Sequence, residues 1–116
     1  MSTQLGTIGE ATVKLYFLKR GFEVYTGDDN TSCDFLTLNP ATGIMKRVEV
    51  KTTRRRNKND SAWVVDIRKS YGDTPFNPSM VDLLAVYIEP VDEIRIFKSE
   101  DISNGTLLTL KDNVGE

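Results

Sequence analysis

Histidine is absent from the 116-residue sequence, and cysteine occurs once, at Cys33. Without histidine, the chain cannot build a serine-histidine-aspartate triad, a cysteine-histidine dyad or a histidine-ligated zinc site. A single cysteine excludes an intrachain disulfide and a cysteine-only zinc site, and it is typical of a reducing compartment. Any metal ion must therefore be held by oxygen ligands, which favours magnesium, manganese or calcium.

The sequence also lacks a long hydrophobic run. No apolar stretch approaches the roughly 18 residues that a membrane-spanning helix needs. The first residues have neither the basic start nor the apolar stretch of a signal peptide. We therefore expect a cytoplasmic protein with no membrane partner.

The chain as a whole has no large excess of charge of one sign, but one short segment does. The 15 basic and 17 acidic residues give a net charge of −2, which argues against a protein that coats nucleic acid or membranes by bulk charge. Residues 46–58, however, hold seven basic residues and one acidic residue, a net charge of +6, which leaves −8 on the rest. The composition, 39% hydrophobic and 28% charged, is that of an ordinary globular protein, and the length fits one domain over residues 1–116.

Local patterns predict one helix followed mainly by strands. Residues 7–20 are expected to be helical and to end at Gly21. The helix should bury a stripe of apolar side chains, which two more widen: Leu5, Ile8, Ala11, Leu15 and Leu18, with Val13 and Phe17. Strands are predicted over residues 22–25, 33–38, 44–53, 62–67, 83–88 and 93–97, loops over 54–60 and 70–80, and a short helix from 99 to 104. This order predicts an α+β fold that is α/β three-layer-like.

The strand predicted over residues 44–53 contains candidate catalytic and metal-binding residues. Because side chains alternate along a strand, Glu49 and Lys51 should share one face, while Val48 and Val50 face the core. In a hairpin with the preceding strand, Asp34 would lie beside Glu49. Two close carboxylates repel each other unless a cation lies between them, and Mg²⁺ takes few carboxylates with several waters. A lysine beside a metal-bound water can orient that water for attack on a phosphodiester.

Three short motifs resemble the PD-(D/E)xK nuclease superfamily: Gly9-Glu10, Cys33-Asp34 and Glu49-Val50-Lys51. Together with the segments at 81–87 and 92–97, they are similar to a small-endonuclease branch that includes intron-encoded homing endonucleases and is akin to archaeal Holliday-junction resolvases. The resemblance covers residues 6–100. The sequence departs from the pattern at Cys33, where the family has proline, and after Lys51, where the helix expected in the family is weak.

This resemblance implies a restriction-endonuclease-like core, a helix followed by a mixed β-sheet (αβββ…β). It also implies roles for particular residues. Asp34, Glu49 and the carbonyl of Val50 would bind Mg²⁺ or Mn²⁺, Lys51 would position the attacking water, and Glu10 would complete the acidic cluster.

Each of these residues also has a plainer interpretation. Glu10 could close a capping box with Thr7 at the start of the helix. Glu49 and Lys51 could be the solvent-facing side of a half-exposed strand, and Asp34 could cap a turn. Trp63 is expected to be core, with base stacking as the lesser alternative, and Tyr71 and Phe76 leave both possibilities open.

Four basic residues follow the proposed metal strand directly: Arg54, Arg55, Arg56 and Lys58. They could be an ordinary solvated loop. Their position favours phosphate contacts, because the acidic site would otherwise repel a polyanion.

Two hypotheses follow. The first is a magnesium-dependent endonuclease acting on DNA, branched or site-specific, as a homodimer or larger homo-oligomer, because one active site cuts one strand. The alternative is a catalytically inactive module with a nuclease fold that serves nucleic-acid binding or assembly.

Overall fold

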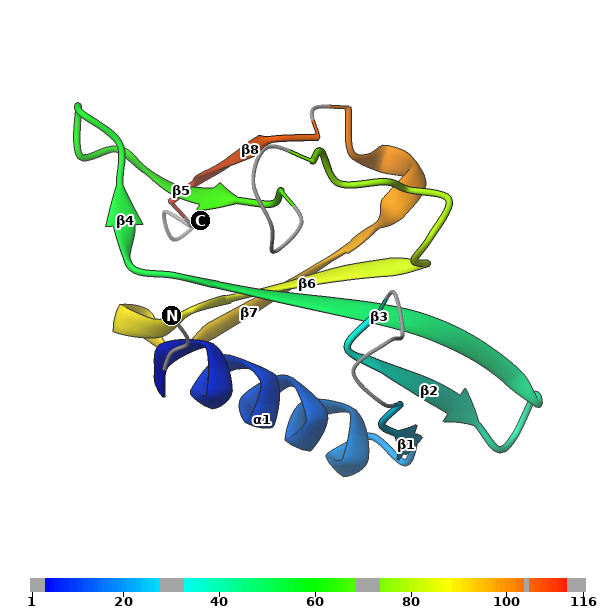
Figure 1. Cartoon of the computed structure of the whole chain (residues 1–116). Coiled ribbons are helices and arrows are strands. Elements are labelled where there is room, and N and C mark those ends of the chain that lie inside the picture. The colour runs from blue at the N-terminus through cyan, green and yellow to red at the C-terminus, as the bar shows by residue number, and fades with distance from the viewer. Residues whose placement is uncertain (1–3, 28–32, 69–73, 104, 113–116) are drawn as a thin grey trace.

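A computed structural model describes residues 4–27, 33–68, 74–103 and 105–112 in three layers (Figure 1). Helix α1 (Gln4–Lys19) packs on one face of a five-stranded sheet, and a three-stranded sheet packs on the other face. The central sheet has the order β1 (Glu23–Tyr25), β2 (Phe35–Asn39), β3 (Ile44–Thr53), β6 (Leu83–Ile88), β7 (Glu93–Lys98). The outer sheet has the order β4 (Arg55–Arg56), β5 (Ala62–Asp66), β8 (Leu107–Lys111), and two short 3₁₀ helices span Glu89–Val91 and Ser99–Asp101. The α+β, three-layer-like prediction is confirmed.

Helix α1 begins earlier than the sequence indicated. It ends as expected, because Gly21 has a φ of 88° and the amides of Gly21 and Phe22 return to the carbonyls of Leu18 and Phe17, both at 3.1 Å. Since the helix starts at Gln4, Thr7 lies within it and cannot be its N-cap. The capping-box interpretation of Glu10 is therefore wrong, and Glu10 pairs with Lys14 at 3.0 Å instead.

The predicted buried stripe of this helix is right only in part: Val13 and Phe17, expected to widen the stripe, are buried, but four of its five main members are exposed. The residues that face the sheet are Gly9, Val13 and Phe17, four apart, whereas Ile8, Leu15 and Leu18 are 44–52% exposed. Gly9 explains the choice of face, because a Cβ built there would lie 1.8 Å from Thr52 Oγ1. The glycine allows the helix to approach β3 closely, and the rest of the buried face follows from this contact.

The central sheet contains the predicted hairpin. β2 and β3 pair antiparallel with Phe35 opposite Val48 and Asn39 opposite Ile44, and Gly43 turns the chain with a φ of 76°. β6 runs parallel to β3 and antiparallel to β7, and it is buried from Leu84 to Ile88, as its apolar sequence predicted. β3 continues past the end of β2, so that from Glu49 onward the side of β3 that β2 would cover carries no paired strand in the described part of the chain.

The outer sheet lies where the nuclease family was expected to have a helix. Residues 54–60 include strand β4 and are not wholly a loop, and β8 was not predicted at all. Trp63 and Phe76 are buried in the core between the two sheets, which confirms the core interpretation of Trp63, whereas Tyr71 lies outside the described residues. The helix predicted from 99 is a single 3₁₀ turn. No helix in the described ranges is long and apolar enough to cross a membrane.

The contact between Gly9 and Thr52 leads to a prediction about stability. Gly9→Ala should lower the free energy of unfolding by roughly 1–3 kcal/mol, although alanine favours helices, because its methyl group would overlap the Thr52 hydroxyl. Chemical denaturation measures the change. Thr52→Ala in the same chain removes the overlapping oxygen and should restore most of the loss, and an additive double variant would contradict this explanation.

Candidate functional site

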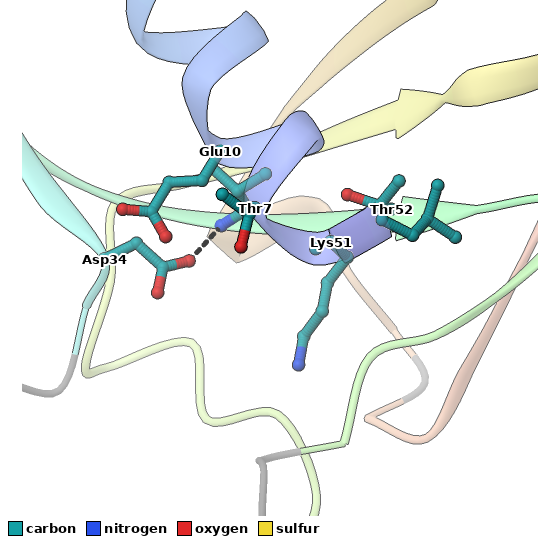
Figure 2. A pocket seen from close by; sticks show the side chains of 8 residues that line it. Thr7, Glu10, Asp34, Lys51 and Thr52 are labelled. Carbon is teal, nitrogen blue, oxygen red and sulfur yellow. Dashed lines mark hydrogen bonds between the residues drawn. The ribbon is translucent and has the colours of Figure 1, made fainter. Parts of the chain in front are cut away.

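A cavity of about 560 Å³ lies between the first turns of α1 and the uncovered side of β3 (Figure 2). The cavity is lined by residues of the first turns of α1, by the residue that precedes β2, and by the second half of β3. These residues are Leu5, Gly6, Thr7, Glu10, Asp34, Val50, Lys51 and Thr52. Three of the four predicted catalytic residues therefore meet at one cavity. The fourth, Glu49, is next to Lys51 on β3.

Asp34 is the residue that joins these elements. Its amide donates to the Val48 carbonyl at 2.9 Å, and its carboxylate accepts the Val50 amide at 2.7 Å. The Asp34 carboxylate thereby takes the place of a main-chain carbonyl of β2 as the acceptor for the Val50 amide. The turn-cap interpretation of Asp34 is wrong, because its partner is across the hairpin and not local. The amide and carbonyl of one residue in a strand point to the same side, so the Val50 carbonyl is also directed to this edge.

The electrostatics of the site disfavour the ionised Asp34. Burial raises the pKa of Asp34 to about 6, and the negative charges of Glu49 and Glu10 add to the rise. The Val50 amide and the Lys51 ammonium oppose it. The carboxyl group therefore lies where a positive charge would stabilise its ionised form.

Glu49 and Lys51 lie on the face of β3 that is turned away from α1. Their side chains are 13% and 17% exposed and form an ion pair at 3.5 Å, and the Lys51 ammonium also donates to the Arg68 carbonyl at 2.8 Å. The interpretation of this pair as a solvent-facing surface is therefore wrong. Glu10 comes from the helix on the other side of β3, as Figure 2 shows, and its carboxylate is near that of Asp34. Asp34 thus lies at the strand edge between the two glutamates.

This arrangement can be tested against the needs of a divalent cation. Within the described ranges, no group of three or more Asp, Glu or Cys side chains is placed to hold a metal ion. Mg²⁺ does not require one, because it usually takes one or two carboxylates and keeps several waters. Asp34, one glutamate and the Val50 carbonyl are hard oxygen donors at one strand edge, and the negative charges of Glu49 and Glu10 near Asp34 would be offset by a cation. The donor set therefore fits magnesium or manganese.

The four basic residues proposed to bind phosphate differ in whether acidic side chains already pair with them. Arg56 donates to Asp60 and Asp112, both at 2.7 Å, and Arg54 pairs with Glu89 at 2.8 Å. Arg55 and Lys58 are exposed, and neither forms an ion pair with a carboxylate of the described residues. Phosphate binding stays a prediction, with Arg55 and Lys58 as the two cations that are not engaged by acids.

Sequence reasoning missed three contributors to the site. Thr7 and Thr52 line the cavity, and the Arg68 carbonyl holds the Lys51 ammonium. Thr52 could have been found from the period-two pattern that places it on the same face as Val50. The Arg68 contact depends on how the outer sheet packs on β3, and no local pattern indicates it.

The raised pKa of Asp34 predicts how stability depends on pH. The fold favours the protonated carboxyl, so its stabilising contribution is complete below the ordinary pKa of 3.8 and is lost as the pH rises through about 6. In EDTA at pH 8, Asp34→Asn should therefore increase the free energy of unfolding by roughly 1–3 kcal/mol, while keeping an oxygen for the Val50 amide. Denaturant titrations at pH 8 and pH 4 measure this, and most of the gain should be lost at pH 4.

Asp66→Asn is the matched control for this prediction. Hydrogen bonds from Arg68 lower the pKa of Asp66 to about 2, so neutralising it should give no gain at pH 8. An equal effect of both variants would mean that the result reflects net charge and not the site.

No protein-family model and no curated protein matches the chain. Among solved structures, the chain is similar to a bacterial homing endonuclease, I-Ssp6803I, with a TM-score of 0.77 and 24% sequence identity over 99% of this chain and 80% of that one. At this level of identity the likeness shows the fold: the helix and mixed sheet described above are those of an endonuclease-like structure.

Proposed function

We propose that the chain is a divalent-metal-dependent endonuclease that hydrolyses phosphodiester bonds in DNA. The observation that carries the proposal is the position of Asp34, whose carboxylate is fixed by the Val50 amide at the strand edge between Glu10 and Glu49 and has a pKa raised to about 6. Lys51, on the same strand as Val50, supplies a positive group that can orient the attacking water. The similarity to a homing endonuclease and the PD-(D/E)xK motifs support this proposal.

The residues would divide the work as follows. Asp34, Glu49 and the Val50 carbonyl would hold Mg²⁺ or Mn²⁺, with Glu10 contacting it directly or through a water. When bound, the cation supplies positive charge that offsets the phosphate and eases deprotonation of water. Lys51, whose ammonium is held by the Arg68 carbonyl, would orient the water that attacks phosphorus. The bond to the 3′ oxygen then breaks and that oxygen takes a proton, leaving a 5′-phosphate and a 3′-hydroxyl.

Cutting both strands of a duplex or a branched junction requires two such sites. Because the chain offers one, we propose that it acts as a homodimer or a larger homo-oligomer.

The direct test is nicking of supercoiled plasmid with Mg²⁺ or Mn²⁺, compared with EDTA. Lys51→Ala and Glu49→Gln should each lower the metal-dependent rate by roughly 10²-fold or more, because they remove the water-orienting cation and a metal ligand. Gel densitometry over time gives the rates.

Lys98→Ala and Glu100→Gln are the matched controls, since they remove the same kinds of charge from exposed positions outside the site. They should cut like the wild type. Equal rates for the site variants and the controls would refute the catalytic proposal.

The second candidate function, a nuclease-fold module that binds nucleic acid without cutting, has two observations in its favour. Glu49 and the Arg68 carbonyl already engage Lys51, and the described residues present no group of three acids. Titration calorimetry with Mn²⁺ separates the two functions. For an endonuclease, the wild type should bind Mn²⁺ and gain thermal stability from it, Asp34→Ala should abolish both effects, and exposed Asp101→Ala should leave both in place. A wild type without metal binding would favour the non-catalytic module.

A further inference from the structure

The hairpin formed by β4 and β5 lies at the edge of the outer sheet, and its turn extends beyond both sheets. Figure 1 shows its turn projecting at the upper left of the molecule, past the end of β3. We call residues 57–61 the hairpin tip. Of these, Lys58, Asn59, Asp60 and Ser61 are exposed, and so is Arg55 at the start of β4.

The hairpin tip is held by its own hydrogen bonds. The Asn57 side-chain oxygen accepts the Ser61 amide at 2.8 Å, and its nitrogen contacts the Ser61 hydroxyl at 3.1 Å. Asp60 adopts a φ of 55°, and its amide returns to the Asn57 carbonyl at 3.1 Å. The turn is therefore preformed, so a partner that binds it does not have to order it.

Arg56 fixes the hairpin to the body of the protein. Its guanidinium donates to both carboxylate oxygens of Asp112 at 2.7 and 2.9 Å, and to the Asp60 carbonyl at 2.7 Å. It also lies 4.5 Å from the centre of the Trp63 ring. With these contacts Arg56 holds the hairpin, while Lys58 and Asn59 are presented at its end.

The hairpin tip is a turn that projects from the outer sheet, where β5 pairs with both β4 and β8, and the major groove of B-DNA admits an element as wide as a two-stranded ribbon. We propose that the hairpin tip enters a DNA groove and reads base edges, with Lys58 and Asn59 as specificity-determining side chains. This inference rests on the proposed action on DNA. A lysine ammonium suits the acceptor atoms of guanine, and an asparagine amide suits the donor and acceptor pair of adenine.

The reach of the hairpin limits where these bases lie. Residues from Lys51 to Lys58 span at most about 25 Å when fully extended. Since base pairs are spaced at about 3.4 Å, the main chain of Lys58 lies within about seven base-pair steps of the main chain of Lys51, and the two lysine side chains extend this range.

The experiment is a selection of bound sequences from randomised duplex DNA in EDTA, which needs no cleavage. The wild type should enrich a preference at one or a few neighbouring positions, and Lys58→Ala and Asn59→Ala should each reduce that preference about tenfold at the position each reads. Lys46→Ala removes an exposed lysine near the far end of β3 and should keep the preference while weakening binding no more than Lys58→Ala does. Circular dichroism and a thermal melt verify the fold of each variant.

Several outcomes would overturn the inference. If Lys58 contacts phosphate alone, Lys58→Ala will weaken binding to all sequences equally and will lower the salt dependence of binding by about one counterion, with the preference intact. An unaltered preference in Asn59→Ala, or a wild type that selects no sequence, also overturns it. The plasmid assay is independent: a protein that nicks DNA without a tip-dependent preference retains the proposed function, and one that selects DNA through the tip but does not nick loses it.

Discussion

The structure of the site depends on one cross-strand interaction, the bond from the Val50 amide to the Asp34 carboxylate. It joins residues that are 16 apart in sequence, and it exists because the hairpin pairs Phe35 with Val48. A slip of one residue would turn Asp34 and Lys51 to the wrong faces. The site therefore also depends on the turn at Gly43, because the turn sets this register.

The edge of β3 that no strand covers is the reason why Asp34 can bind the Val50 amide. β2 begins only at Phe35, opposite Val48, so a side chain and not another strand takes the Val50 amide, and the Val50 carbonyl is directed to the same edge. Gly9 lets α1 approach β3 and brings Glu10 to the cavity from one side, while Glu49 and Lys51 lie on the other face. Burial and neighbouring negative charge then raise the pKa of Asp34, so a positive charge at this edge would stabilise the ionised carboxylate.

Three of the seven basic residues in segment 46–58 stabilise the fold. Arg47 binds Asp82 through its backbone amide and its guanidinium, Arg54 pairs with Glu89, and Arg56 with Asp60 and Asp112. Each of these pairs ties the segment to a distant part of the chain or closes a turn. A count of charges along the sequence therefore overstates the cationic surface, which in the described part of the chain is carried from this segment by Lys46, Arg55 and Lys58.

Local signals in the sequence determined the helix, the β2–β3 hairpin and the buried strand β6. The apolar spacing and Gly21 define the helix, the turn residues define the hairpin, and an almost unbroken apolar run defines β6, each within a few neighbouring residues. The sequence also identified Asp34, Glu49 and Lys51 as candidates, because the hairpin and the alternation of side chains place them near each other.

Tertiary packing decided the rest. Several apolar stripes were possible on α1, and the contact of Gly9 with Thr52 selected the one that is buried. The outer sheet forms because β8 pairs with β5 across a long separation in sequence, which no local pattern encodes. Glu10 and Glu49 lie on opposite sides of β3 for the same reason: the alternation of side chains is local, but which layer covers each face is a property of the whole fold.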